Sequence, residues 1–150
     1  MSYLADMKNM LIVGIGNPIR SDDGIGNYIC EKITTMNMAG VETLCIQQLQ
    51  VEFIETFSRY DVVMIVDASV NGADAEITPI QQGSSSIPSS HHMHPQELSS
   101  IAELTMNISP KFVLCTVKGT NFDFGEDFSE TAIRNANSAI SLILQWINEH

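Results

Sequence analysis

The stretch Asn9-Met-Leu-Ile-Val-Gly-Ile-Gly-Asn-Pro18 decides the fold of this 150-residue chain. Its first half, residues 9–13, is a short apolar run rich in strand-forming residues, and the glycines and proline that follow cannot continue a strand. From Gly24 onward, apolar residues recur at helical spacing, and Asp22 and Asp23 stand where acidic side chains favour a helix N-terminus. The sequence therefore predicts a strand, a glycine-rich turn and a helix in succession.

The alternation of strand and helix patterns continues to the C-terminus. Further strands are expected at residues 41–47, 62–66, 75–81 and 112–117. Pro79 suggests an edge position for the run at 75–81. Helices are expected at residues 51–57, at residues 95–105 and from Asp127 or Ser129 onward. This pattern predicts an α/β three-layer sandwich with a mostly parallel central sheet of about five strands and helices on both faces. The length of 150 residues and a hydrophobic content of 44% indicate one domain over residues 1–150. Ligands of such folds bind beyond the carboxyl ends of the strands.

The bulk composition narrows the possible partners. The net charge of −11 repels phosphate backbones and anionic lipid, which argues against nucleic acid as a partner. The longest apolar runs fall far short of the ~20 residues needed to cross a bilayer. The first residues lack the basic and apolar segments of a secretion signal. We therefore expect a cytoplasmic protein whose partner is a protein or a cation.

The three cysteines, Cys30, Cys45 and Cys115, are far apart in the sequence, and each lies in an apolar stretch. They form no Cys-x-x-Cys motif that would indicate redox chemistry or a zinc site. Buried thiols with a packing role are therefore expected at all three positions.

The loop after the first strand, residues 14–26, is the first candidate site. A dinucleotide-binding loop needs a third glycine where this chain has Ile19, and Pro18 removes a backbone donor. The adjacent carboxylates of Asp22 and Asp23 would repel a phosphate and attract a metal ion or a protonated group. The loop is thus predicted to favour a cation.

Two further candidates lie farther along the chain. Asp67 directly follows five apolar residues and is expected to project from the sheet end, although a turn-forming aspartate is the ordinary alternative. His91 follows a serine-rich loop and has His92 and His94 beside it, a pattern that also suits a solvated loop. With Asp23, these residues supply two oxygen donors and one imidazole, a set that suits nickel, zinc or cobalt. The residues themselves do not choose among these metals.

In order and spacing, three motifs resemble those of the hydrogenase maturation endopeptidases. The first is Gly14-Ile-Gly16-Asn17 followed by Asp22-Asp23-Gly24, and the second is the apolar run that ends in Asp67 and Ala68. The third is Ser90-His91, with Pro95 and Leu98 downstream. The agreement covers roughly the first two-thirds of the chain, and three motifs in order are more specific than any one alone. After Met106 the resemblance is general.

The resemblance implies an aspartic-type endopeptidase that removes the C-terminal extension of a nickel-loaded [NiFe]-hydrogenase large-subunit precursor. It implies that Asp23, Asp67 and His91 contact the metal and are the catalytic residues, while His92 and His94 fall outside the matched position. The nickel would be carried by the precursor, and no permanently bound cofactor is expected. We also expect a monomer, and the charge and apolar runs described above argue against binding to nucleic acid or membrane.

Two alternatives remain open from the sequence. Peptidyl-tRNA hydrolases also have a Gly-x-Gly-Asn-Pro loop after their first strand, but they need a downstream catalytic histidine where this chain has Asp22-Asp23-Gly24. They also need a basic face, which a charge of −11 argues against. A second alternative is a non-catalytic module that holds nickel-loaded precursor, because no nucleophilic triad is evident in the sequence.

Overall fold

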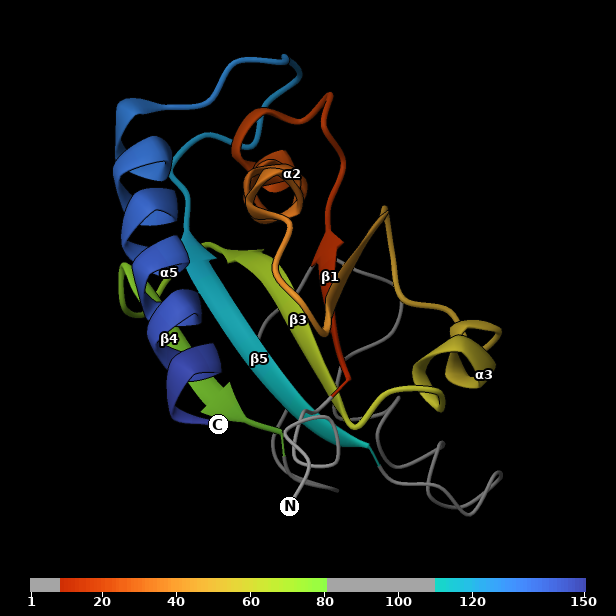
Figure 1. Ribbon diagram of the computed structural model, residues 1–150. Helices are drawn as coiled ribbons and strands as arrows, with labels where there is room; N and C mark the ends of the chain where they lie inside the picture. Colours follow the sequence, from red (N-terminus) through yellow and green to blue (C-terminus); the bar gives the residue numbers. More distant parts are fainter. Residues whose placement is uncertain (1–8, 81–109) are drawn as a thin grey trace, which may run out of the picture.

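The computed structural model describes residues 9–80 and 110–150, and a five-stranded sheet forms the centre of this part (Figure 1). The strand order is β2-β1-β3-β5-β4. Neighbouring strands run parallel, except that β4 is antiparallel to β5. The strands are β1 (Met10–Ile15), β2 (Val41–Ile46), β3 (Val62–Ser69), β4 (Ala75–Pro79) and β5 (Lys111–Lys118). The predicted mostly parallel sheet is confirmed, and β4 with Pro79 does lie at an edge.

Two central strands are longer than the sequence pattern predicts. β1 continues through Gly14 and Ile15 because both residues pair with β2. β3 continues past the apolar run to Ser69, because β5 pairs with it as far as the match of Ser69 with Lys118. Tertiary pairing thus supplies backbone partners that the local apolar pattern does not reveal.

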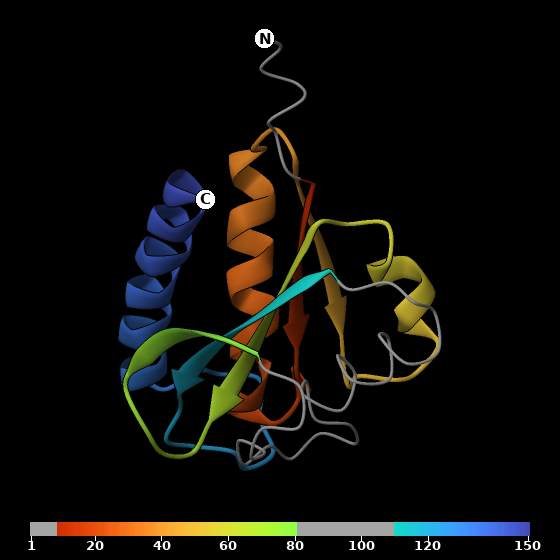
Figure 2. The same ribbon diagram turned by 90° about the horizontal axis from the view of Figure 1, so that it is seen from below.

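Helices cover both faces of the sheet, as predicted, and the two views together show three layers (Figure 2). Helices α2 (Ile25–Met36) and α5 (Glu130–Glu149) pack on one face, against the even-numbered side chains of β1 and β3. Helix α3 (Phe53–Phe57) packs on the other face, against odd-numbered side chains such as Val13 and Ile65. The helix predicted at residues 95–105 lies outside the described residues.

The C-terminal helix begins where the sequence predicts. Ser129 is its N-cap, and the Ser129 hydroxyl accepts a hydrogen bond of 3.1 Å from the backbone N–H of Ala132. The inner stripe of α5 is buried, with Ala136, Ala139 and Ile143 in the core. Within the described ranges, no helix combines the length and the apolar character that a membrane span requires.

Candidate functional site

The strand order creates a switch point between β1 and β3. From β1, the chain passes through α2 to β2 on one side, and then through α3 to β3 on the other side. Pairing of β1 with β3 ends at Gly14 and Val66. Past this pair the chain leaves β1 for the loop that leads to η1 (Ser21–Gly24), which we call the glycine-rich loop. Strand β3 instead continues beside β5. Ligands of open α/β sheets bind at such a point, outside the carboxyl ends of the strands.

Two glycines allow the loop after β1 to pack directly on these strand ends. Gly16 has a φ of +153°, and a Cβ atom there would lie 1.8 Å from the carbonyl oxygen of Asp23. At Gly26, a Cβ atom would lie 2.5 Å from the Val66 oxygen and 2.8 Å from that of Ile15. These close approaches need residues without a side chain. They bring the turn that carries Asp23 to the end of the strand that carries Asp67.

Asp23 lies in a short 3-10 helix, η1 (Ser21–Gly24), directly before α2. Its side chain is 8% exposed, and one carboxylate oxygen accepts a hydrogen bond of 2.9 Å from the backbone N–H of Asn17. The Asn17 side chain in turn accepts a 3.1 Å hydrogen bond from the N–H of Ile19. The glycine-rich loop therefore holds the Asp23 carboxylate with its own backbone.

Asp67 lies within β3, not after its end as the sequence suggested, and it is paired in register with Thr116 of β5. Its side chain is 5% exposed, so it is more enclosed than a residue projecting from a sheet end. Residues of η1 and β3 approach within 8 Å between Cα atoms. The structure thus brings the elements that carry Asp23 and Asp67 together at one edge of the sheet.

The sheet face that packs on α3 changes from apolar to polar at this edge. In β3, Val63 and Ile65 lie in the core on that face, and strict alternation places Asp67 and Ser69 next on the same side. Thr116 and Lys118 follow in the same way in β5 and are their register partners. The Ser69 hydroxyl is buried and has no hydrogen-bond partner among the described residues, which is unusual for a native structure. The alternation in the two strands could have indicated Ser69, Thr116 and Lys118 as part of a polar end.

Asp22 differs from its neighbour Asp23, because it is fully buried and joins two distant loops. One of its carboxylate oxygens accepts hydrogen bonds from the backbone N–H groups of Thr120 and Asn121 and from the Ser129 hydroxyl. The other accepts a 2.8 Å bond from the Ser129 N–H. Burial alone would raise the pKa of Asp22, but these hydrogen bonds outweigh it and lower the pKa below the ordinary value of 3.8. Asp22 thus stays ionised and connects the η1 turn to the loop that precedes α5.

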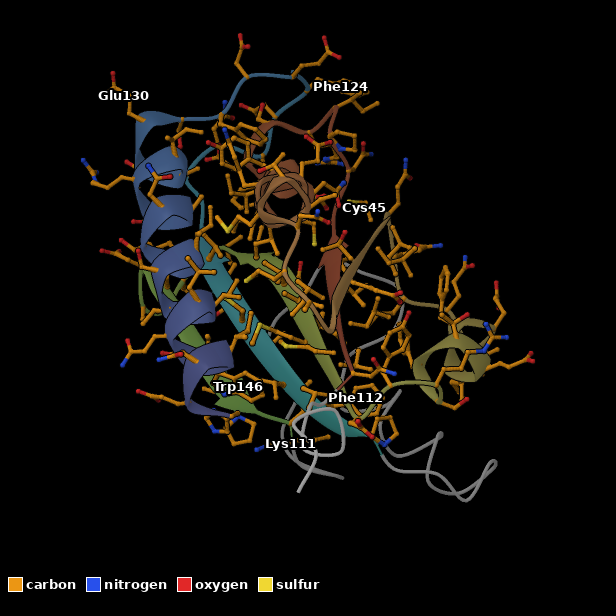
Figure 3. All side chains as sticks on the ribbon, viewed as in Figure 1. Cys45, Lys111, Phe112, Phe124, Glu130 and Trp146 are labelled. Atoms are coloured by element: carbon orange, nitrogen blue, oxygen red, sulfur yellow. The ribbon has the colours of Figure 1, made fainter. Side chains whose placement is uncertain are left out.

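The segment 119–125 is fixed along the glycine-rich loop by further backbone contacts. The N–H of Ser21 donates to the Gly125 carbonyl at 2.8 Å, and the N–H of Gly125 donates to the Ile19 carbonyl at 2.9 Å. Phe124, at the tip of this segment, is 84% exposed and points away from the protein (Figure 3). No local sequence pattern indicates this junction, because its partners are about a hundred positions apart.

The third predicted site residue, His91, lies outside the described residues, as do His92 and His94. Within residues 9–80 and 110–150, no group of three or more histidine, cysteine, aspartate or glutamate side chains could hold a metal ion. The described part of the candidate site therefore consists of Asp23 and Asp67, with the polar strand ends around them.

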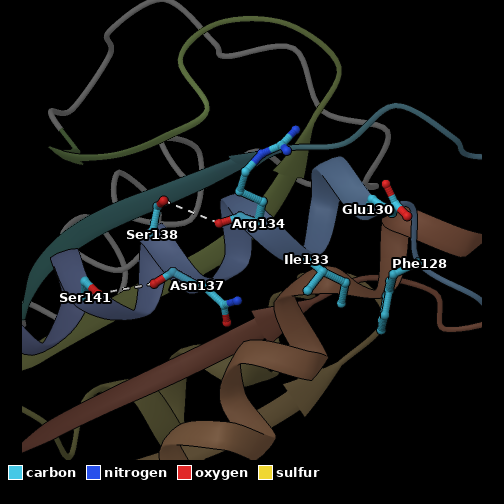
Figure 4. A pocket seen from close by; sticks show the side chains of 7 residues that line it. All are labelled: Phe128, Glu130, Ile133, Arg134, Asn137, Ser138 and Ser141. Atoms are coloured by element: carbon cyan, nitrogen blue, oxygen red, sulfur yellow. Dashed lines mark hydrogen bonds between the residues drawn. The ribbon is translucent and has the colours of Figure 1, made fainter.

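A separate groove runs along the outer side of α5, with a volume of about 620 Å³ (Figure 4). It is lined by Phe128 and by residues of α5, and neither Asp23 nor Asp67 contributes to it. Two of its hydroxyls, those of Ser138 and Ser141, already donate to carbonyl groups of the same helix. Both serine hydroxyls of the groove are thus already engaged within α5.

The expectation of three buried cysteines is wrong at one position. Cys30 and Cys115 are buried, but Cys45 is exposed on the edge strand β2. An edge strand has a neighbour on one side only, so the local apolar pattern overstates its burial.

Several solved structures of hydrogenase maturation proteases match this chain in fold. The [NiFe] hydrogenase maturation protease HycI from Thermococcus kodakarensis matches with a TM-score of 0.71 and 22% identity, over 98% of this chain and 99% of that one. The hydrogenase maturating endopeptidase HybD from E. coli matches with a TM-score of 0.77 and 20% identity, over 94% and 93%. A hydrogenase 2 maturation peptidase from a Thaumarchaeota archaeon matches with a TM-score of 0.69 and 16% identity, over 93% and 98%.

Sequence comparison adds nothing to this likeness. No family model matches the chain, and no curated protein matches it. The structural matches nevertheless extend over nearly all of both chains, so they concern the whole architecture and not one motif. The chain therefore has the fold of the hydrogenase maturation proteases.

Proposed function

We propose that this protein is an endopeptidase that removes the C-terminal extension of a nickel-loaded [NiFe]-hydrogenase large-subunit precursor. One observation carries the proposal: the Asp23 turn and the Asp67 strand meet at the switch point of a sheet with the maturation-protease fold. The three sequence motifs that suggested this family lead to the same residues. We place the reaction in the cytoplasm and expect a monomer.

In the proposed reaction, the nickel is part of the substrate. Asp23 and Asp67 supply carboxylate oxygens and His91 supplies an imidazole nitrogen to the nickel ion seated in the precursor. Hard oxygen donors beside one imidazole suit a borderline divalent cation such as nickel. A metal held in this way polarises the scissile carbonyl or a water molecule and fixes it relative to the peptide bond.

The geometry of the two aspartates supports this role. Asp23 and Asp67 are both less than a tenth exposed, so a cation at this edge would meet carboxylates that are already largely shielded from water. Electrostatic attraction is stronger where water is excluded. The hydrogen bond from Asn17 orients Asp23 before any ligand arrives, which lowers the cost of ordering it on binding.

The test is cleavage of purified precursor in nickel-loaded and nickel-free forms, followed by intact-mass measurement. We expect the loaded precursor to lose its C-terminal extension and the nickel-free precursor to keep its full mass. Efficient cleavage of the nickel-free form would contradict metal recognition. A stable complex with uncut, loaded precursor would instead support the non-catalytic binding module, and absence of both binding and cleavage would refute the proposal.

A further inference from the structure

Two cysteines that are well separated in the sequence meet where α2 packs on β1 and β2. The Cys30 thiol of α2 donates a weak hydrogen bond to the Ile12 carbonyl at 3.6 Å and lies 4.0 Å from the Leu44 carbonyl. Leu44 immediately precedes Cys45 in β2. The sulfur of Cys30 therefore lies above the boundary between β1 and β2, at the level of Cys45.

The absence of a side chain at Gly14 makes room for this arrangement. Gly14 of β1 is the register partner of Cys45, and a Cβ atom at Gly14 would lie 2.9 Å from the Cys30 sulfur. The Cys30 side chain thus occupies the space that a larger residue in β1 would fill. It stands directly beside the strand position that carries Cys45.

A second contact between α2 and β2 fixes which side chains face each other. The hydroxyls of Thr34 and Thr43 are 2.6 Å apart. Four residues back along α2, a step of about 6 Å, leads to Cys30. Two residues onward along β2, a step of about 6.6 Å, leads to Cys45 on the same face of the strand. The two steps are nearly equal, so Cys30 and Cys45 face each other as the threonines do.

The two thiols differ in access and in acidity. Cys45 is exposed, whereas Cys30 is completely buried. The neighbouring Cys30 thiol lowers the pKa of Cys45 to about 7, against the opposing effects of partial burial and of Glu31. The interaction with Cys45, together with burial, raises the pKa of Cys30. Cys45 is therefore the thiolate that meets a reagent from solvent, and Cys30 is the thiol held behind it.

We propose that Cys45 and Cys30 form a peroxide-oxidation site that closes to an intrachain disulfide between β2 and α2. The Cys45 sulfur attacks one oxygen of hydrogen peroxide, so that a sulfur–oxygen bond forms, the oxygen–oxygen bond breaks, and water leaves after protonation. The Cys30 sulfur then attacks the Cys45 sulfenic acid, so that the disulfide forms and a second water leaves with the Cys30 proton. In sum, two thiols lose two electrons and two protons, and one peroxide is reduced to two waters.

The disulfide would link the edge strand β2 covalently to α2, the helix that follows the Asp23 turn. It would close the segment between residues 30 and 45, which includes the end of α2 and the connection to β2. A cross-link of this kind constrains the unfolded chain, so the oxidised protein should melt at a higher temperature than the reduced one. This inference does not depend on the proposed peptidase activity, and its test uses no precursor.

The test treats the folded, full-length protein with hydrogen peroxide, removes the peroxide, and then denatures and alkylates the protein for intact-mass measurement. After alkylation, two of the three thiols should remain unlabelled. Before alkylation, the peroxide-treated protein should be about 2 Da lighter than the untreated protein, which is the mass of two hydrogens. A reducing agent should restore three reactive thiols, and peptide mapping should find Cys30 linked to Cys45. Three thiols that still react, oxygen added to Cys45 without a cross-link, or a dimer joined through Cys45 would each overturn the proposal.

Single substitutions provide matched controls. Cys45→Ser changes an exposed side chain, and after peroxide this variant should keep both of its remaining thiols. Cys115→Ala removes the cysteine on β5, a strand that pairs with neither β1 nor β2, and this variant should lose both of its thiols. If Cys45→Ser also lost two thiols, the pairing would be Cys30 with Cys115 and the proposal would be wrong.

Discussion

The backbone N–H of Asn17 donates a 2.9 Å hydrogen bond to the carboxylate of Asp23, six residues farther along the chain. Gly16, directly before Asn17, lies so close to Asp23 that a Cβ atom there would overlap the Asp23 carbonyl oxygen. The same short loop thus determines both the backbone position and the side-chain orientation of Asp23. The candidate site depends on this local closure as much as on its carboxylates.

We expect Gly16→Ala to disrupt the loop. The new Cβ atom would lie 1.8 Å from the Asp23 oxygen at a φ of +153°, so the variant should lose more than about 2 kcal/mol of unfolding free energy, as well as processing activity. Urea unfolding and the precursor assay measure the two effects. Gly72→Ala is the matched control, since Gly72 also has a positive φ, of +92°, but has open space around it. That variant should lose only about 1 kcal/mol, and equal losses in the two variants would contradict the close approach.

We expect Asp67→Asn to fold normally and to lose precursor cleavage by about 100-fold or more, because the amide keeps the size of the side chain but removes the charge that attracts the metal. The rate is measured with nickel-loaded precursor, and circular dichroism checks the fold. Asp74→Asn, which changes an exposed carboxylate just before β4, should cleave at the normal rate. A folded Asp67→Asn variant with normal turnover would remove Asp67 from the reaction.

Asp22→Asn should destabilise the protein without a direct effect on the metal. An amide at this position would place its own N–H group against the backbone N–H groups of Thr120, Asn121 and Ser129. We expect the free energy of unfolding to fall by about 2 to 4 kcal/mol at neutral pH. Urea unfolding of both proteins measures the difference. Asp123→Asn, on the exposed side of the same segment, is the control and should change stability little.

The stability difference between wild type and Asp22→Asn should depend on pH with a defined sign. The folded pKa of Asp22 lies below 3.8, so the carboxylate contributes its full stabilisation above the unfolded pKa. The contribution is lost as the pH falls through the folded pKa, and the two proteins should converge in stability below pH 3.8. A difference that stays constant from neutral to acid pH would show that the charge of Asp22 does not contribute.

The alkylation rate of Cys45 should rise as the pH passes about 7, because the thiolate is the reactive form. Cys30→Ala removes the neighbouring thiol, so the pKa of Cys45 should return toward its ordinary value of 9.0 and the rate profile should move to higher pH. Glu31→Gln should move it the other way, since the Glu31 charge opposes ionisation of Cys45. Iodoacetamide labelling of the folded protein across this pH range measures all three profiles. Identical profiles for wild type and Cys30→Ala would contradict the thiol contact.

Within the described residues, the sequence by itself determined the order of strands and helices and the end of the sheet at which the two candidate aspartates lie. Apolar runs such as Val62–Val66 and the helical stripe that begins at Ala132 are local patterns, and local periodicity directly reflects which face of an element is buried. Because the carboxyl ends of parallel strands lie at one edge, placing Asp23 after the first strand and Asp67 at the end of a later one was enough to predict that they come together. The predicted contribution of His91 stays a prediction.

Only the tertiary structure decided the different roles of the neighbouring residues Asp22 and Asp23. Their side chains are chemically identical, and what separates them is a set of hydrogen-bond donors 98 to 107 positions away, which fold onto Asp22 and leave Asp23 to the glycine-rich loop. The contact of Cys30 with Cys45 and the extension of β3 to Ser69 likewise depend on packing between separate elements. Interactions of this kind leave no periodic pattern in the sequence, because they depend on where the chain returns in space and not on which residues are adjacent.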